Sequence, residues 1–196
     1  MELYQEALQT FRTLLDEAAR GGEPEPGAMT LATADEHGRI AARIVLLKGL
    51  DERGFAFYTN YDSAKAAQLE RTRNAALCIL WKTLRFGIQV RVEGGIERTS
   101  AAESDAYFAS RPRESQIGAW ASLQSQTLAE RDVLDARVTE FERKFAGAAV
   151  PRPPHWGGYR VQPDLIEFWY GQRARLHERV RYERIEGSWT KRLLYP

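Results

Sequence analysis

Short runs of β-forming residues, each followed by turn residues, constrain the fold of this chain more than any other feature. Five runs lie in the first half, at residues 29–33, 40–47, 55–59, 75–81 and 86–96. Turn-forming residues break the pattern: Asp35-Glu36-His37-Gly38, Asp51-Glu52-Arg53-Gly54 and Gly94-Gly95. Strands this short, joined by tight turns, indicate an antiparallel meander that closes into a barrel.

Helical patterns frame these strands. Apolar residues recur at helical spacing before Gly21-Gly22, which predicts an N-terminal helix within residues 1–22. Further helices are expected at 63–71, 100–109 and 128–145; the second of them begins with the capping-box pattern Ser-Ala-Ala-Glu. Later strands are expected at 159–161, 165–170, 180–185 and 189–194, so residues 151–196 would complete the barrel. The predicted fold class is α+β, with a single domain over residues 1–196 and peripheral helices.

Several common kinds of site lack their motifs in this sequence. The three histidines have no zinc-like spacing, and there is neither a Walker loop nor a Gly-x-Gly-x-x-Gly turn, so no metal site is expected. The net charge of +1 gives no overall attraction to nucleic acid. The single cysteine, Cys78, lies in an apolar run and is expected to be a buried structural thiol. The sequence has no apolar stretch of about eighteen residues, so no membrane contact is expected. We expect a cytoplasmic protein.

Two groups of cations beside strands and helices could bind anions. Arg43 and Lys48 would point to opposite faces of a regular strand, roughly 17 Å apart at about 3.3 Å per residue. They either serve two separate anionic groups or are ordinary charges at a strand end. Arg111, Arg113 and Ser115 cluster where Pro112 can begin a helix, which indicates either a phosphate site or a solvated cap.

A third group lies near the C-terminus. Arg175, His177 and Arg179 alternate, so a strand would place all three side chains on one face. Residues 172–192 hold seven Arg or Lys against three Glu, and such a run is usually a solvated basic face. The alternation instead favours an anionic, electron-rich ligand.

These segments, in this order, resemble the pyridoxamine 5′-phosphate oxidase family, the flavin enzymes of vitamin B6 metabolism. The similarity runs from about Met29 to Pro196. It is carried by Arg43-Ile-Val-Leu-Leu-Lys48, Phe57-Tyr-Thr-Asn60, Ser110-Arg-Pro-Arg113 with Ser115-Gln-Ile-Gly-Ala-Trp120, and Ile166-Glu-Phe-Trp169 followed by Arg175-Leu-His-Glu-Arg179. The last segment is close to the signature of the family. The resemblance implies a Greek-key split β-barrel that binds FMN in two clefts at the interface of a homodimer.

The resemblance also implies roles for individual residues. For the cofactor, Arg43 and Lys65 would hold the FMN phosphate, and the other contacts would come from Ile44, Val45, Leu46, Leu47, Lys48, Tyr58, Thr59 and Gln89. Four cofactor contacts would reach the flavin from the partner chain: Gln124, Ser125, Trp169 and Arg179. The substrate phosphate would lie against Lys48, Tyr107, Arg111 and Ser115. Catalysis is assigned to Arg175 and His177, which with Leu176 would cover the substrate ring.

The activity implied by the resemblance is oxidation of pyridoxamine or pyridoxine 5′-phosphate to pyridoxal 5′-phosphate. Dioxygen would accept the electrons and yield hydrogen peroxide, and the amine would also release ammonia. Two alternatives are a related flavin oxidase acting on a substrate such as a phenazine precursor, and a non-catalytic protein that binds FMN or pyridoxal phosphate. The chain departs from the family pattern at Ala64, where the usual residue is Arg, and at Tyr170.

Overall fold

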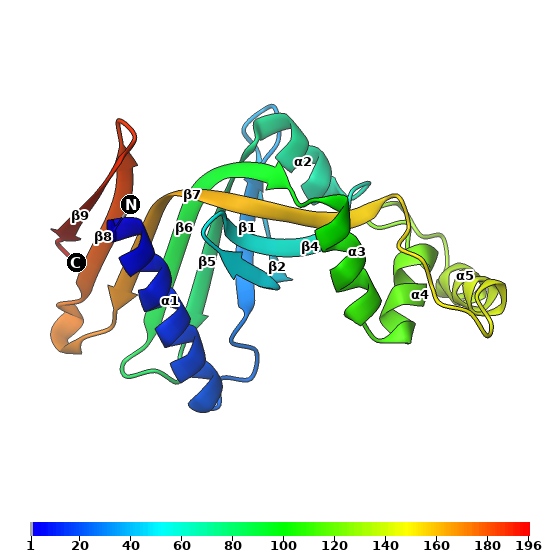
Figure 1. Cartoon of the computed structure of the whole chain (residues 1–196), viewed down its shortest axis with the longest axis horizontal. Coiled ribbons are helices and arrows are strands. Elements are labelled where there is room, and N and C mark those ends of the chain that lie inside the picture. The colour runs from blue at the N-terminus through cyan, green and yellow to red at the C-terminus, as the bar shows by residue number, and fades with distance from the viewer. Residues whose placement is uncertain (1) are drawn as a thin grey trace.

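One curled antiparallel sheet forms the frame of the molecule (Figure 1). The computed structural model describes residues 2–196. Along the main sheet the strand order is β2-β1-β5-β6-β7-β4-β3, and the β8–β9 hairpin extends from β7. The strands are β1 (Ala28–Ala34), β2 (Ile40–Leu46), β3 (Gly49–Asp51), β4 (Gly54–Asn60), β5 (Asn74–Trp81), β6 (Ile88–Arg98), β7 (Trp156–Tyr170), β8 (Glu178–Ile185) and β9 (Ser188–Leu194).

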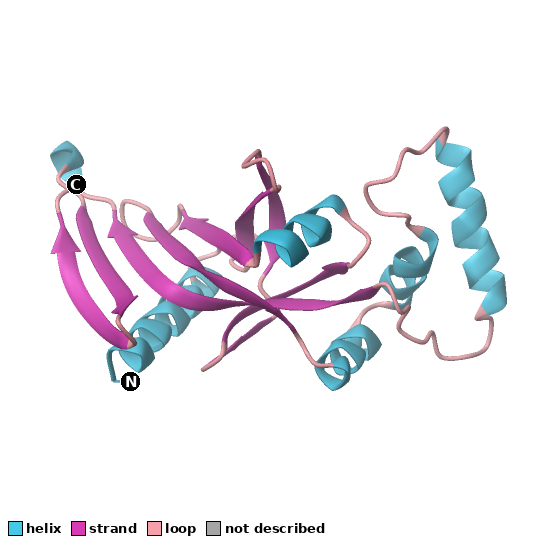
Figure 2. Cartoon of the chain, turned by 90° about the horizontal axis from the view of Figure 1, so that it is seen from above, coloured by secondary structure: helices cyan, strands magenta, loops and turns pink. Residues whose placement is uncertain are grey.

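Five α-helices and one short 3₁₀ turn are described. They are α1 (Glu2–Arg20), α2 (Ala64–Thr72), α3 (Ala101–Ser110), α4 (Arg113–Ala121), α5 (Arg131–Lys144) and η1 (Arg173–Arg175). Figure 2 shows α4 and α5 beyond one end of the sheet, while α1 lies against the other half. The predicted α+β class with peripheral helices is confirmed.

The main core lies between α1 and one face of the sheet. The apolar face of α1 is buried, and the Phe11 ring meets Phe55 edge-on at 4.9 Å and Trp81 at 5.5 Å. Burying aromatic rings of this size contributes much of the hydrophobic stabilisation of a small domain. A second cluster joins α3, α4 and α5 to the start of β7 through residues such as Phe108, Phe141 and Trp156.

Strand β7 corrects one prediction. Two separate strands were expected at 159–161 and 165–170, but residues 156–170 form one strand that pairs with β4, β6 and β8. The ladder to β6 shifts register after Glu93, where Gly94 faces Pro163. A Cβ at Gly94 would lie 1.9 Å from the Gln162 carbonyl oxygen, so only glycine lets the strand continue past the proline.

Capping explains where the helices of the site begin. Ser100 and Glu103 form the predicted capping box at the start of α3, with Ser100 Oγ accepting from the Glu103 N–H at 3.1 Å. Ser63 caps α2 as predicted, and Pro112 stands just before α4.

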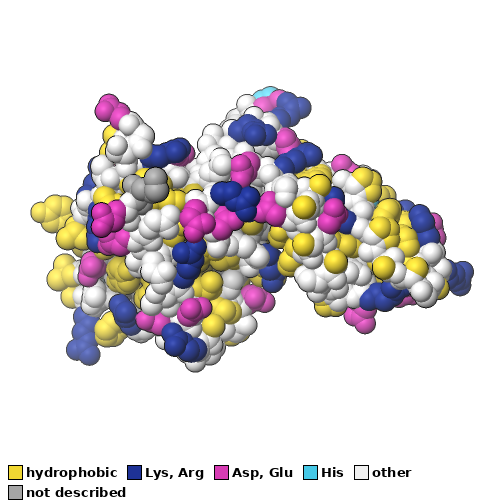
Figure 3. Space-filling model, viewed as in Figure 1, with side chains coloured by type: hydrophobic (Ala, Val, Ile, Leu, Met, Phe, Trp, Pro, Cys, Tyr) yellow, Lys and Arg dark blue, Asp and Glu magenta, His cyan; other side chains and the backbone are white. Residues whose placement is uncertain are grey.

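On the face seen in Figure 3, basic and acidic side chains are interspersed, and apolar side chains gather at the edge formed by the C-terminal strands.

Candidate active site

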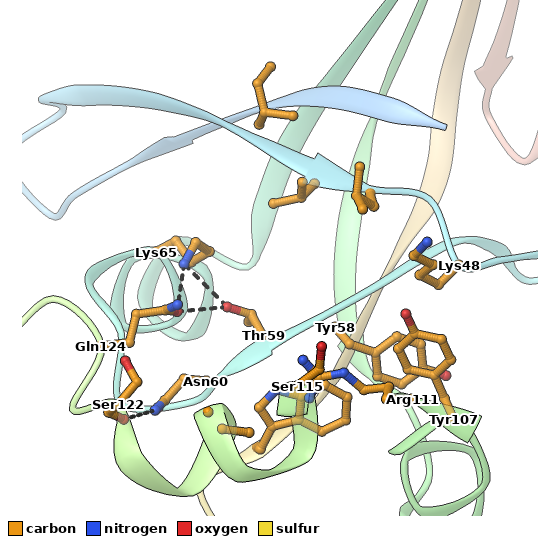
Figure 4. Close-up of a pocket in the computed structure, with 16 residues that line it drawn as sticks. Lys48, Tyr58, Thr59, Asn60, Lys65, Tyr107, Arg111, Ser115, Ser122 and Gln124 are labelled. Carbon is orange, nitrogen blue, oxygen red and sulfur yellow. Dashed lines mark hydrogen bonds between the residues drawn. The ribbon is translucent and has the colours of Figure 1, made fainter. Parts of the chain in front are cut away.

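A cavity of about 480 Å³ opens between β2, β4, α3 and α4. Three of its lining side chains are cations, and none is a carboxylate. Figure 4 shows these cations at two ends, with Lys65 on one side and Lys48 and Arg111 on the other. The lining residues are Ile44, Val45, Leu46, Lys48, Tyr58, Thr59, Asn60, Lys65, Tyr107, Arg111, Ser115, Gly118, Ala119, Ser122, Gln124 and Trp156.

At the first end, Lys65 is held by neutral oxygens. Its Nζ donates to Gln124 Oε1 at 2.9 Å and to Thr59 Oγ1 at 3.2 Å. Among residues 2–196 no carboxylate pairs with it. Burial lowers the pKa of Lys65, and the nearby positive charge of Arg43 lowers it further. An ammonium group without a counter-ion, beside the N-terminus of α2, suits an anion such as a phosphate.

Arg43 stands behind this end rather than in the cavity lining. Its guanidinium donates to Thr33 Oγ1 at 2.5 Å and to Gln68 Oε1 at 3.2 Å. Burial lowers its pKa. Lys48 follows the end of β2 and does line the cavity, so the two cations have different surroundings.

At the second end, Arg111 lies among aromatic rings where α3 ends. Its Cζ is 4.7 Å from the Trp156 ring centroid, and its Nη1 is buried without a hydrogen-bond partner among the described residues. Burial lowers the pKa of this guanidinium. Tyr107 stacks on Tyr58 at 4.2 Å, and Ser115 lines the same end from α4. A buried, unpaired N–H donor in a cavity wall marks a place where an anionic ligand would satisfy it.

Arg113 was expected in the same cluster, and the structure places it elsewhere. Its guanidinium donates to the carbonyl oxygens of Phe145 at 2.6 Å and Ala148 at 2.8 Å. It therefore satisfies carbonyl groups at the end of α5 and does not line the cavity.

Gln124 and Ser125 also differ from their expected placement. The resemblance implied that they reach the cofactor from the partner chain. In the structure both contact the Lys65 end of the cavity in their own chain. Gln124 accepts from Lys65, and Ser125 Oγ accepts from the Ala64 N–H at 3.2 Å. The loop between α4 and α5 brings them there, with Ser125 in a left-handed conformation at φ 74°.

Leu47, also expected at the cofactor, does not line the cavity: its N–H donates to the Gly27 carbonyl oxygen at 2.8 Å, and its side chain packs against the main core. The other predicted residues lie near the end of β7 that is opposite Trp156. Trp156 lines the cavity and Trp169 lies thirteen residues further on, about 43 Å along an extended strand. One chain therefore does not bring the two groups together. The group at the far end consists of Gln89, Trp169, Arg175, Leu176, His177 and Arg179. Gln89 was expected to act with Tyr58 and Thr59 of its own chain, but it pairs with Trp169 and does not line their cavity.

Arg175, His177 and Arg179 do not lie on one strand, so the shared face that a strand would give them is absent. Residues 173–175 form a 3₁₀ turn, and β8 begins only at Glu178. Gly171 causes the change: its N–H donates to the Gly87 carbonyl, and a Cβ there would lie 2.2 Å from the Phe86 carbonyl oxygen. The segment is thus folded against the loop before β6 instead of running straight into β8.

Local strain marks this turn as a candidate functional loop. Ala174 and Arg175 both have positive φ, 54° and 60°, which costs free energy in residues other than glycine. The His177 ring lies 4.4 Å from the Trp169 ring, and its Nδ1 accepts from the Gln172 N–H at 3.1 Å. Arg175 and His177 are therefore presented from a folded loop.

Glu167 was not singled out from the sequence, although it lies inside the segment Ile166-Glu-Phe-Trp169. It is 2% exposed, and each of its carboxylate oxygens accepts two hydrogen bonds from one arginine. These arginines are Arg179 and Arg181, and their bonds lower the pKa of the carboxyl against the effect of burial. In the sequence, a single acidic residue among the apolar residues of this segment was the signal that could have indicated a buried, paired carboxylate.

Other residues of the cavity were also missed by sequence reasoning. They are Asn60, Gly118, Ala119, Ser122 and Trp156.

Within residues 2–196 no three potential metal ligands come together. No described helix combines the length and apolar character needed to cross a membrane.

Comparison with known proteins assigns the chain to a family. Residues 15–145 match the family described as pyridoxamine 5′-phosphate oxidase, and residues 156–196 match the pyridoxine 5′-phosphate oxidase C-terminal dimerisation region. The pyridoxine/pyridoxamine 5′-phosphate oxidase of Xanthomonas euvesicatoria pv. vesicatoria is 59% identical over 197 residues, covering 100% of this chain and 99% of that protein. The corresponding protein of Myxococcus xanthus (strain DK1622) is 53% identical and covers 96% and 91%.

Solved structures agree with this assignment. The crystal structure of PhzG from Burkholderia lata, in complex with tetrahydrophenazine-1-carboxylic acid, has a TM-score of 0.85 at 34% identity and covers 94% of this chain and 91% of that one. A pyridoxamine 5′-phosphate oxidase-related, FMN-binding protein of Nostoc punctiforme has a TM-score of 0.74 at 18% identity over 95% and 97%, which supports the split-barrel fold. The chain belongs to the pyridoxamine 5′-phosphate oxidase family.

Proposed function

We propose that this chain binds FMN and oxidises pyridoxamine or pyridoxine 5′-phosphate to pyridoxal 5′-phosphate. Dioxygen is the electron acceptor and becomes hydrogen peroxide; the amine substrate also takes up water and releases ammonia. The observation that carries the proposal is one cavity with cations at two separate ends and no carboxylate in its lining. Two phosphorylated molecules, each bearing about −1.5 to −2 charges, need such a pair of cationic ends.

The end around Lys65 fits the phosphate of FMN. Lys65 and the N-terminus of α2 supply charge and N–H donors, and the neutral oxygens around Lys65 leave its charge uncompensated. Ile44, Val45 and Leu46 provide an apolar wall from β2 for a flat ring system. Ala64 gives this end no second side-chain cation at the start of α2, so Arg43 behind it is the remaining candidate.

The end around Arg111 fits the phosphate of the substrate. Arg111 has a buried N–H without a partner, Lys48 lies opposite it in Figure 4, and the hydroxyl groups of Tyr107 and Ser115 are within the same lining. A phosphate ester held here would orient the substrate ring along the cavity toward the cofactor. Fixing both reactants in one geometry is a major source of rate acceleration.

The redox chemistry would be that of FMN held in this cavity, which would accept a hydride from the substrate and give the electrons to dioxygen. The chain's own residues bind and orient. Arg175 holds the substrate ring and stabilises negative charge that develops on it, and His177 orients the ring or moves a proton at its polar substituent. Because both lie at the far end of β7, they come from the partner chain of a homodimer, as do Trp169 and Arg179. The C-terminal match to a dimerisation region supports this arrangement.

A second candidate is the oxidation of a phenazine precursor, favoured by the likeness to PhzG. The PhzG ligand carries a carboxylate and no phosphate ester, so a ligand of that kind would place about one negative charge beside Lys48 and Arg111, where a phosphate ester places about −1.5 to −2. A non-catalytic binding protein is a third possibility, but it gives no reason for the strained loop that presents Arg175. Peroxide release from pyridoxamine 5′-phosphate, compared with unphosphorylated pyridoxamine, separates these functions.

Subunit complementation gives a sharper test. Arg111→Ala and Arg175→Ala chains should each lose most turnover, because each homodimer carries the same defect in both sites. In a mixed dimer, one site combines both defects and the other has neither, so about half the wild-type activity per mixed dimer should return. Arg113→Ala serves as the matched control, since Arg113 does not line the cavity. Full activity of both single variants would disprove the assignment, and failure to complement would show that the two groups do not meet across an interface.

A further inference from the structure

Aromatic rings, rather than a carboxylate, hold the guanidinium of Arg111. Its Cζ lies 4.7 Å from the ring centroid of Trp156 and 5.7 Å from that of Phe108. In the part of the chain that the structure describes, Arg111 forms no ion pair. Arg160 is the opposite case, with Glu97, Glu103 and Asp51 all within 3.5 Å. The position of Arg111 is therefore set by contact with aromatic faces.

Trp156 is the closer of the two aromatic platforms for Arg111. It begins β7, is 6% exposed, and lies edge-on to Phe108 at 5.1 Å and nearly parallel to Tyr58 at 5.5 Å. Its backbone is fixed on both sides, because its N–H donates to the Pro153 carbonyl and its own carbonyl accepts from Arg152 Nη1 at 2.6 Å. The indole therefore offers Arg111 a surface whose place does not depend on a bound ligand.

The chemistry of this platform leaves Arg111 available for an anion. A carboxylate partner would occupy two guanidinium N–H donors and cancel the positive charge. An indole face attracts the cation through its quadrupole, which uses no N–H donor and leaves the charge uncompensated. The buried Nη1 of Arg111 is indeed without a partner, while Ser115 and Lys48 face the same space. Burial lowers the pKa of Arg111, which reflects a charge that a ligand can stabilise.

We infer that Trp156 is a positioning residue for phosphate recognition: its indole face fixes Arg111 while leaving that guanidinium free to bind the phosphate ester of the substrate. The inference deepens the proposed function and rests on it. It predicts that Trp156 contributes to the preference for phosphorylated over unphosphorylated ligands, through Arg111 and not through the cofactor.

The test uses FMN-loaded enzyme and calorimetric titration with pyridoxal 5′-phosphate and with pyridoxal. Trp156→Leu should weaken binding of the phosphorylated ligand about tenfold, since a desolvated cation–π contact is lost, and should change binding of pyridoxal less than about twofold. Trp156→Phe keeps an aromatic face and should lose only about threefold. Trp120→Leu is the matched control, because Trp120 belongs to the same apolar cluster but packs on Phe141 and Phe145 instead of Arg111.

A double-mutant cycle separates positioning from a general structural role. If Trp156 acts through Arg111, Trp156→Leu should have little further effect on phosphate binding in an Arg111→Met background. Equal losses for pyridoxal and its phosphate, or full additivity, would overturn the inference while leaving the proposed function standing. Arg111→Met with unchanged binding of the phosphorylated ligand would instead remove the proposed phosphate site. Should Trp156→Leu fail to fold, unchanged binding in Trp156→Phe also overturns the inference.

Discussion

The two ends of β7 treat positive charge in opposite ways. At the Trp156 end, Lys48, Lys65 and Arg111 line a cavity that contains no carboxylate. At the other end, Arg179 and Arg181 share the buried carboxylate of Glu167 through four hydrogen bonds. The first arrangement leaves charge available for an anionic ligand, whereas the second uses the charge to hold neighbouring strands together.

The two arrangements differ in what they cost the folded chain. A buried cation without a counter-ion loses hydration that nothing replaces, and the lowered pKa values of Lys65 and Arg111 reflect this. A ligand that binds only the folded state and supplies the missing negative charge stabilises the protein by mass action. At the Glu167 end that charge is already part of the chain, so its contribution to stability needs no ligand.

Removing the Glu167 carboxylate should have the largest effect of the changes proposed, and this effect is a loss of stability. Glu167→Ala leaves Arg179 and Arg181 without their carboxylate and also removes the longer contact of Arg91 at 3.9 Å, so the free energy of unfolding should fall by about 3–5 kcal/mol. Urea unfolding followed by tryptophan fluorescence measures this loss. Glu93→Ala is the matched control: its partner Arg91 lies in the same sheet but is more exposed, and the loss should stay below about 1 kcal/mol. Similar values for both variants would contradict the contrast between the two ends.

A carboxylate placed in the cavity should make the Trp156 end of β7 resemble the Glu167 end, where a carboxylate neutralises the cations. In Ser115→Asp the new charge would pair with Arg111 or Lys48 and repel the substrate phosphate, so kcat/KM for pyridoxamine 5′-phosphate should fall about 100-fold. Ser115→Asn, similar in size but neutral, should lose about tenfold or less. Steady-state peroxide release gives both values. If the two variants were equally impaired, shape rather than charge would govern this end.

Most of the fold follows from local pattern, and its exceptions have tertiary causes. Strand periodicity and capping residues located β1, β2 and α3 within a residue or two. The continuity of β7 past Pro163 could not be read locally, because it depends on Gly94 in the neighbouring strand. The turn at Arg173–Arg175 likewise depends on how Gly171 packs against Phe86. Neither contact leaves a trace in the periodicity of its own segment.

The candidate site was predictable where a residue lies within a recognisable segment. Arg111 and Ser115 were identified in this way and line the cavity. Arg113 looks equivalent to Arg111 in the sequence, but the start of α4 turns it toward the carbonyl groups that end α5. Trp156 follows a proline-rich connector and gains its place only because β7 begins beside α3, some 45 residues away in the chain. That meeting is a property of the whole fold.

Arg160 shows that function, and not location, separates the two treatments of charge. It lies in β7 near the end that holds Trp156, yet it pairs with Glu103 at 2.7 Å. Glu103 lies in the first turn of α3, the helix that carries Tyr107 and ends before Arg111. The hydrogen bond from Arg160 to Glu103, with those from Ser100, lowers the pKa of that carboxyl from 4.5 to about 2.

Acid should therefore weaken the pairing of Glu103 with Arg160 while leaving the cavity cations charged. The resulting loss of stability should be smaller than the two effects above. A carboxyl whose folded-state pKa is depressed contributes its full stability above its unfolded value and loses it as the pH falls from about 4.5 to about 2. Because Glu103 is partly exposed, we expect a loss of about 1–2 kcal/mol across that window. Urea unfolding at a series of pH values gives the slope, and Glu103→Gln should flatten it, since the amide cannot take up the proton. An unchanged slope in that variant would assign the acid sensitivity to other carboxylates, with Glu167 the next to be tested.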